Sequence, residues 1–184
     1  MYKLIIEAEH LVEITSLDSF DLVGTSLEAS ASPFLSAIRN ALTYLAHTGK
    51  EIIVKCHFGS IAGFTAANED TKKILDAITR DFESVVDGKV TVYVGTYRYW
   101  VDSWNHGKII VVDGKKLITG GSNYYRNHYL REDPIHDVSI QVSGGPAITA
   151  HLYSKTLWRT ACEWLFAGVI DGLLPSGLPF DNPL

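Results

Sequence analysis

The sequence predicts an α/β fold in which a mixed, largely parallel β-sheet is flanked by helices. Between residues 32 and 95, segments with apolar residues at helical spacing alternate with short segments rich in β-branched residues. This order of elements is typical of parallel strands joined by crossover helices. The apolar run of residues 109–112 adds a strand that suits burial on both faces of the sheet.

The clearest helix signal covers residues 32–49. Ser32 and Pro33 supply an N-cap and a first-turn proline, and Gly49 supplies a residue that ends the helix. The other elements expected before residue 100 are strands at 11–14, 51–56 and 89–95, a helix at 68–88, and an extended piece or loop at 20–24.

The last part of the folded region is expected to contain one strand and one long helix. Residues 136–142 alternate as a strand, and Pro146 opens the helix. His151 and Lys155 lie one turn apart on this helix, and we expect both at the surface.

Composition describes one ordinary globular domain. The 184 residues are 46% hydrophobic and 20% charged, enough for a sizeable core. Residues 168–184 hold three prolines and three glycines, so we expect a folded domain at 1–167 followed by a linker or docking tail. The formal net charge of -5 counts against a dedicated nucleic-acid binder.

Cysteine usage and hydropathy exclude several further classes of protein. Cys56 and Cys162 offer neither a disulfide framework nor zinc-ligand spacing, and their apolar surroundings predict buried free thiols. The N-terminal segment lacks the apolar run of a signal peptide, and no run is long enough to span a bilayer. If Met1 is the true start, we expect a cytoplasmic protein or one exported without a cleaved signal.

One stretch, residues 106–123, combines several residue types that suit chemistry at phosphorus. Alternation along a strand places His106 and Lys108 on one face, and Asp113 with Gly114 predicts a turn. A short returning strand at 117–119 is then followed by two glycines, a serine and an asparagine, which are Gly120, Gly121, Ser122 and Asn123.

Phosphoryl transfer is the reaction that these residue types favour. A neutral imidazole can attack phosphorus and form a covalent intermediate. A lysine ammonium offsets charge on the non-bridging oxygens, glycines let backbone N–H groups approach an anion, and an asparagine amide adds one donor. Each feature alone is common in proteins, whereas the whole string in one frame is not.

The string resembles the HKD motif of the phospholipase D superfamily, His-x-Lys-x4-Asp-x6-Gly-(Gly/Ser)-x-Asn. Residues 136–164 are also similar to this superfamily, with an acidic residue on a strand, a Gly-Pro pair and a helix bearing tryptophan. The resemblance implies a phospholipase D-like sheet and a reaction without metal or cofactor. The motif positions matched in this sequence are His106, Lys108, Asp113, Gly120, Gly121 and Asn123.

The resemblance also implies a role for each matched residue. His106 would be the nucleophile, and Lys108 and Asn123 would bind the phosphate together with the Gly120–Ser122 turn. Asp137 would bond the far nitrogen of the nucleophilic ring, which fixes its tautomer and stabilises the cation. Asp113, although part of the catalytic motif, is more often structural in this superfamily.

The family's active sites use two HKD motifs, and this sequence contains one. No second His-x-Lys is present, and His151 with Lys155 has the wrong spacing. We therefore expect either a homodimer or the N-terminal half of a longer phospholipase-type protein with a second HKD half in a C-terminal domain.

The implied function is hydrolysis of phospholipids through phosphohistidine, with peripheral membrane contact. The aromatic residues at 97–100 and Trp104 form either a rim for a lipid interface, a base-stacking surface or plain packing. His57, just past a predicted strand, either lines the site or lies at the surface. The alternatives are a dimeric HKD-type nuclease, for which nucleic acid is the less favoured partner, and a non-catalytic half-domain that binds anions.

Overall fold

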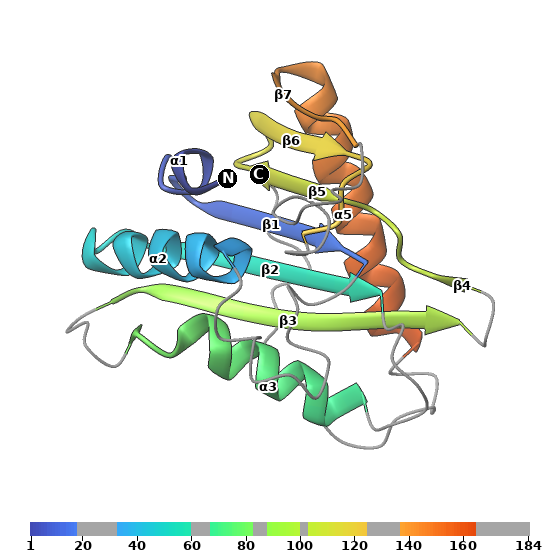
Figure 1. The fold of residues 1–184 in the computed structure, drawn as a ribbon, viewed down its shortest axis with the longest axis horizontal. Helices are drawn as coiled ribbons and strands as arrows, with labels where there is room; N and C mark the ends of the chain where they lie inside the picture. The colour runs from blue at the N-terminus through green and yellow to red at the C-terminus, as the bar shows by residue number, and fades with distance from the viewer. Residues whose placement is uncertain (18–32, 60–66, 83–87, 100–102, 125–136, 165–184) are drawn as a thin grey trace, which may run out of the picture.

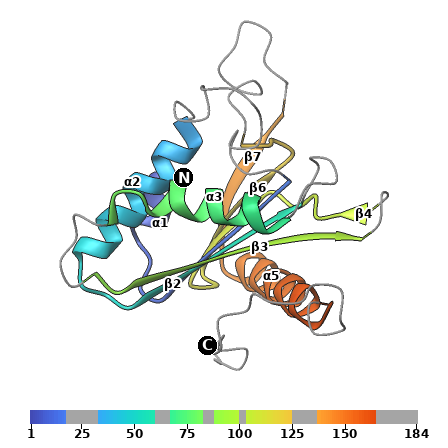
Figure 2. The same ribbon diagram turned by 90° about the horizontal axis from the view of Figure 1, so that it is seen from below.

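The computed structural model describes residues 1–17, 33–59, 67–82, 88–99, 103–124 and 137–164. Its centre is a seven-stranded sheet in the order β4-β3-β2-β1-β5-β6-β7 (Figure 1). Helices α1, α2 and α3 cover one face of this sheet, and α5 crosses the other face (Figure 2). The elements are α1 Tyr2–Ile5, β1 Leu11–Ser16, α2 Pro33–His47, β2 Ile52–Gly59, α3 Ala67–Thr79, β3 Val90–Tyr99, β4 Ser103–Trp104, β5 Ile109–Val112, β6 Lys116–Gly120, β7 Ser139–Ser143 and α5 Gly145–Trp164.

The expected mixed α/β sheet is confirmed, but its parallel part is smaller than predicted. β2 runs parallel to both β1 and β3, because the connections from β1 to β2 and from β2 to β3 pass through α2 and α3. The pairings β1–β5, β5–β6, β6–β7 and β3–β4 are antiparallel. The sheet is therefore mixed rather than largely parallel. Residues 113–115 join β5 to β6, and so short a connection can join only antiparallel strands.

Most of the expected elements are present, with different ends. β2 and β3 extend beyond the predicted residues, and α3 ends at Thr79, earlier than the predicted 88. The short α1 and β4 carried no sequence signal. The expected extended piece at 20–24 and the tail at 168–184 lie outside the described residues.

The main core fills the space between the sheet and helices α1 to α3. Apolar side chains on alternate strand positions, such as Val54, Cys56 and Phe58 on β2, meet the buried stripe of α2. Burial raises the pKa of the Cys56 thiol to about 12, so the predicted buried thiol is confirmed there. A smaller cluster on the opposite face packs under α5 and consists of Val111, Leu117, Ala147 and Ala150.

The packing of the α5 face includes polar residues among the buried ones. On β1, Glu13 and Thr15 are buried, and His57 is buried on β2. Among the helices of the described segments, none combines the length and hydropathy that a membrane span requires.

Candidate functional site

The residues of the predicted site, with the exception of Asp113, lie at the same end of the central strands. Thr15 near the carboxyl end of β1 pairs with Ile109 at the start of β5, and Gly120 at the end of β6 pairs with Ser139 at the start of β7. The segment that carries His106 and Lys108 therefore lies beside the carboxyl ends of the parallel strands. This is the edge at which open α/β sheets place ligands.

His106 and Lys108 are in direct contact. They precede β5 rather than lie within it, and the Lys108 ammonium is 3.2 Å from Nδ1 of His106 and 2.8 Å from the carbonyl oxygen of that residue. Lys108 is buried, whereas His106 is exposed. The pair thus joins an accessible imidazole to a cation held in the protein.

The electrostatics of this pair favour a neutral imidazole. Burial, and then the charge of Lys108, lower the pKa of His106 below its usual range. Burial also lowers the pKa of Lys108, while the carboxylate of Asp137 acts in the opposite direction. A neutral imidazole is the form that can act as a nucleophile.

Gly120 and Gly121 allow the chain before β7 to lie directly against the end of β6. A Cβ atom on Gly120 would lie 2.2 Å from the carbonyl oxygen of Val138, and one on Gly121 would lie 2.4 Å from Oδ1 of Asp137. The N–H of Gly121 donates to the carbonyl oxygen of Val138 at 3.3 Å. This amide is therefore not free to bind an anion, contrary to the sequence-based expectation, and the glycines bring Asp137 to the site.

Asp137 acts through its charge on Lys108, the neighbour of the predicted nucleophile, rather than through a bond to the nucleophile itself. Its carboxylate acts on Lys108, and Nδ1 of His106 is occupied by the lysine ammonium. The expected bond between Asp137 and His106 is absent from the hydrogen bonds of the described residues.

Ser122 and Asn123 follow the two glycines and carry polar atoms that lack protein partners. The hydroxyl of Ser122 and Oδ1 of Asn123 are buried without a hydrogen bond in the described part of the chain. Ser122 is 1% exposed. Unsatisfied buried polar atoms are uncommon in native proteins, so their presence at this edge is consistent with a polar ligand.

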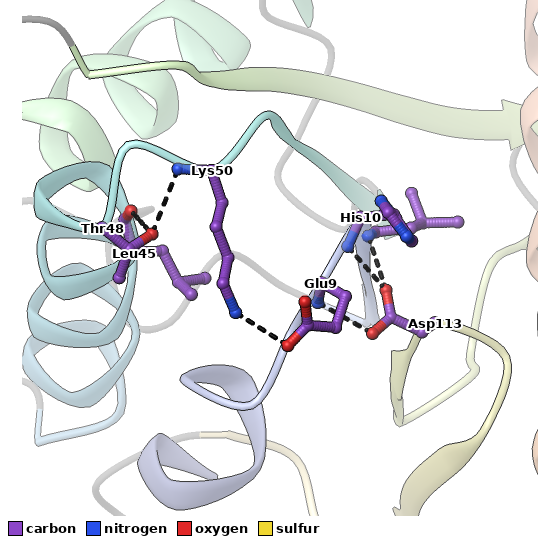
Figure 3. Close-up of polar contacts among 7 residues, drawn as sticks. Glu9, His10, Leu45, Thr48, Lys50 and Asp113 are labelled. Carbon is purple, nitrogen blue, oxygen red and sulfur yellow. Dashed lines mark hydrogen bonds and ion pairs between the residues drawn. The ribbon is translucent and has the colours of Figure 1, made fainter.

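Asp113 lies at the opposite end of β5 and cannot touch a group that reacts with His106. Its carboxylate accepts backbone N–H bonds from Glu9 and His10 at 2.9 Å and from Leu11 at 2.8 Å (Figure 3). Its φ of 52° and that of 62° at Gly114 form the predicted turn. Asp113 therefore fastens the end of β5 to the residues at the start of β1. This position does not support the catalytic role that the sequence motif implied.

His57 and Asn105 contact the site and were not identified as a pair from the sequence. Nδ2 of Asn105 lies 3.1 Å from Nδ1 of His57, and both residues are buried. The surface position considered for His57 is wrong. No local pattern signals this contact, because 48 residues separate the two side chains.

His151 is also more buried than expected, because only 19% of its side chain is exposed. Its Nδ1 lies 2.7 Å from Oε2 of Glu13, whose side chain is 1% exposed. The strand position of Glu13 faces α5, so the pair links the helix to the centre of the sheet. Lys155, one turn further along, is exposed as expected.

No cluster of three or more His, Cys, Asp or Glu side chains that could hold a metal ion occurs within the described segments. The side chains of the predicted aromatic rim, at 97–100 and Trp104, lie outside the described ones.

Comparison with curated proteins finds a relative of known name. Over 166 residues, the sequence is 33% identical to a protein named Phospholipase D from Streptomyces antibioticus. The match covers 89% of this chain and 28% of that protein, so the chain spans less than a third of the relative's length. No family model matches the sequence.

Comparison with solved structures finds proteins whose fold is similar to that of this chain. NucT from Helicobacter pylori superposes with a TM-score of 0.50 at 13% identity, covering 88% of this chain and 84% of NucT. A phospholipase D family member, Nuc from Salmonella typhimurium, gives a TM-score of 0.46 at 13% identity, covering 86% of this chain and 84% of Nuc. At such identity, the likeness to NucT concerns the fold alone.

Proposed function

Because this chain belongs to the phospholipase D superfamily, we propose that it is a phosphodiester hydrolase that works through a covalent phosphohistidine intermediate. His106 is the nucleophile, and Lys108 and Asn123 bind the non-bridging oxygens of the phosphate. Asp137 orients the ring of His106 during the reaction. The turn at Gly120, Gly121 and Ser122 holds Asn123 and Asp137 at the same end of the sheet as His106.

The contact between His106 and Lys108 is the observation that carries this proposal. An exposed imidazole whose pKa is lowered stays neutral and nucleophilic at lower pH than an ordinary histidine. A buried ammonium within 3.2 Å of it is placed to neutralise charge on a phosphate bound at the same point.

Substrate binding would release the nucleophile. An ammonium only donates, so Nδ1 of His106 accepts from Lys108 and the ring proton lies on Nε2, where it blocks attack. When the phosphate of the substrate replaces Nδ1 as the acceptor of the Lys108 ammonium, the ring proton can move to Nδ1. The new Nδ1–H group then donates to Asp137. The free lone pair of Nε2 then attacks phosphorus, the N–P bond forms and the P–O bond to the leaving alcohol breaks.

The leaving oxygen needs a proton that this half-site does not provide. Lys108 is committed to the phosphate and Asp137 to the ring of His106. Burial lowers the pKa of His57 to about 4, and its ring is fully buried, so it is neither charged nor accessible. We propose that a second HKD half, in a partner copy or a following domain, supplies the acid. Once the alcohol has left, the same group takes a proton from water as the water oxygen bonds phosphorus and the N–P bond breaks.

A phospholipid is the proposed substrate, with contact at a membrane surface. The identity of 33% to a protein named Phospholipase D supports this choice. The net charge of -5 disfavours a nucleic acid, which is a polyanion.

Turnover assays on size-separated fractions test the proposal. We expect headgroup release from phosphatidylcholine vesicles in fractions larger than a monomer, or after addition of a second HKD half, and none in monomers. His106→Asn should reduce turnover by roughly a thousandfold or more, as for other covalent nucleophiles. His47→Asn is the matched control, because His47 is exposed on α2, and it should keep normal turnover. A metal chelator should change nothing.

Different failures contradict different parts of the proposal. Normal turnover by His106→Asn would exclude the nucleophile. Activity of a sedimenting monomer would exclude the half-site argument, and cleavage of DNA without release from vesicles would replace the lipid with a nucleic acid. Loss of activity on chelation, restored by a divalent ion, would indicate another chemistry.

A further inference from the structure

The residue before His106 is fastened to its surroundings through both ends of its side-chain amide. Nδ2 of Asn105 donates to Nδ1 of His57 at 3.1 Å and to the carbonyl oxygen of His57 at 3.3 Å. Oδ1 of Asn105 accepts the backbone N–H of Gly107 at 3.0 Å. Asn105 is 4% exposed, so these bonds lie out of solvent. His106 is thus the exposed residue between two anchored ones.

The backbone on each side of His106 approaches the ends of β1 and β2 very closely. A Cβ atom on Gly59, the last residue of β2, would lie 2.1 Å from the carbonyl oxygen of Asn105. A Cβ atom on Gly107 would lie 2.9 Å from Cγ2 of Thr15 and 3.2 Å from Oδ1 of Asn105. The segment 105–107 therefore has little freedom to move away from the sheet.

The ring of His57 favours one orientation of the Asn105 amide, the same one that the carbonyl oxygen of His57 and the N–H of Gly107 favour. Burial lowers the pKa of His57 to about 4, so the ring is neutral at ordinary pH. A neutral ring that accepts at Nδ1 carries its proton on Nε2, and it therefore requires the NH₂ group of Asn105 to face β2. That orientation leaves Oδ1 directed at Gly107. A residue at 57 without a side-chain acceptor would leave the backbone carbonyl of residue 57 as the only acceptor of the NH₂ group among the described residues.

His57 also has an unsatisfied group that simple packing does not explain. Its Nε2 is buried and has no hydrogen-bond partner among the described residues. Its ring stands edge-on to Trp158 of α5, with ring centroids 5.8 Å apart. A phenylalanine would fill such a place without leaving an N–H unpaired, so histidine here costs stability. What histidine provides and phenylalanine does not is the acceptor at Nδ1, which bonds Asn105.

We propose that His57 and Asn105 form a positioning pair that sets the place of His106 for attack on the phosphate. The inference rests on the proposed function, since it assigns the pair to the nucleophile of that reaction. Neither residue touches the reacting atoms. Small displacements of a reacting group can cost about a hundredfold in rate, so a pair that fixes the segment 105–107 has a large effect on turnover.

Three variants separate this role from packing. His57→Phe keeps a ring against Trp158 and removes the acceptor, whereas His57→Asn keeps an acceptor near the position of Nδ1 and loses the ring. Asn105→Ala removes both ends of the amide. His47→Phe is the control, because it makes the same change as His57→Phe at an exposed histidine of α2 that is not bonded to Asn105.

Amide hydrogen exchange of Gly107 is the first readout, and it does not depend on activity. We expect its protection to fall about tenfold or more in His57→Phe and Asn105→Ala, and to stay within about threefold of normal in His57→Asn and in the control. In an active assembly, His57→Phe should lower kcat about tenfold or more with KM within about twofold. His57→Phe should be at least as resistant to denaturant as His57→Asn and yet be the less active of the two.

Normal protection of Gly107 in His57→Phe would overturn the inference, as would a normal kcat in Asn105→Ala while His106→Asn is inactive. Activity that follows the denaturant midpoints of the variants would overturn it too, because packing alone predicts that order. A different result, normal turnover by His106→Asn, would contradict the proposed function itself. If His57→Phe does not fold, Asn105→Ala and His57→Asn carry the same test.

Discussion

Lys108 holds the ring of His106 and the backbone of the same residue at once, with its ammonium 3.2 Å from Nδ1 and 2.8 Å from the carbonyl oxygen. One cation therefore both lowers the pKa of the imidazole and keeps Nδ1 occupied. Removal of the ammonium should change the titration of His106 even when no substrate is present.

Lys108→Met should raise the pKa of His106 toward its usual value. Burial is the larger cause of the lowered pKa and the lysine charge the second, so the return should be partial. The neutral form of His106 is present above its pKa and is lost as pH falls through it, so the variant should protonate at higher pH. NMR titration of the His106 ring measures this, with Lys155→Met as the control. An unchanged or lower pKa in Lys108→Met would contradict the assigned cause.

Asp113→Ala should weaken the fold and leave the chemistry of the folded protein intact. The variant removes the acceptor of three backbone N–H groups at the start of β1, far from His106. We expect a loss of about 1–3 kcal/mol in the free energy of unfolding, since two of these bonds are exposed. Asp113→Asn should lose less, because it keeps an acceptor and tolerates the positive φ. Denaturant unfolding measures the stabilities, and a specific loss of kcat in folded Asp113→Asn would return Asp113 to the catalytic site.

His151→Leu should be more destabilising than replacement of both members of its pair. The single change leaves the carboxylate of Glu13 buried and without its partner, at a cost of about 3–5 kcal/mol. Glu13→Leu combined with His151→Leu removes the charge as well and should recover most of that loss. A double-mutant cycle from unfolding curves measures the coupling. Additive losses would mean that Glu13 and His151 do not depend on each other.

His57 should make the protein less stable in acid. Its pKa is lowered to about 4 in the folded state, so between about pH 6.5 and 4 the unfolded chain binds the extra proton. Stability is then fully present above pH 6.5 and falls as pH drops through this window, by roughly 3 kcal/mol at most. His57→Phe should flatten that part of the curve of unfolding free energy against pH. An equally steep curve in the variant would mean that another group causes the acid loss.

The fold was largely predictable because its elements have local signals. Pro33 and Gly49 mark the first long helix, and the alternating and β-branched segments mark the main strands. The direction of the pairings was less predictable, because it depends on which strands become neighbours. β5 inserts beside β1, and that neighbour relation joins residues about a hundred positions apart.

The candidate site was predictable to the extent that it lies on one continuous string. His106, Lys108 and the turn from Gly120 to Asn123 reach the same edge because β5 and β6 form a hairpin between them. The contacts of His57 with Asn105 and of Glu13 with His151 join distant strands and helices, and no local spacing encodes them. The close approach of Gly121 to Asp137 likewise depends on how β6 and β7 pair in the folded protein, and the sequence around either residue does not indicate it.

The central claim is that His106 becomes covalently bonded to phosphorus during turnover. Phosphohistidine is lost in acid, so the reaction of an active assembly with a phospholipid should be stopped in alkali and digested for mass spectrometry. We expect a phosphatidyl group, or the glycerophosphoryl group that remains of it after the acyl esters are lost in alkali, on the peptide that contains His106, formed at the start of turnover and absent from His106→Asn. Such a group on another residue, or turnover with no covalent intermediate on any peptide, would contradict the account.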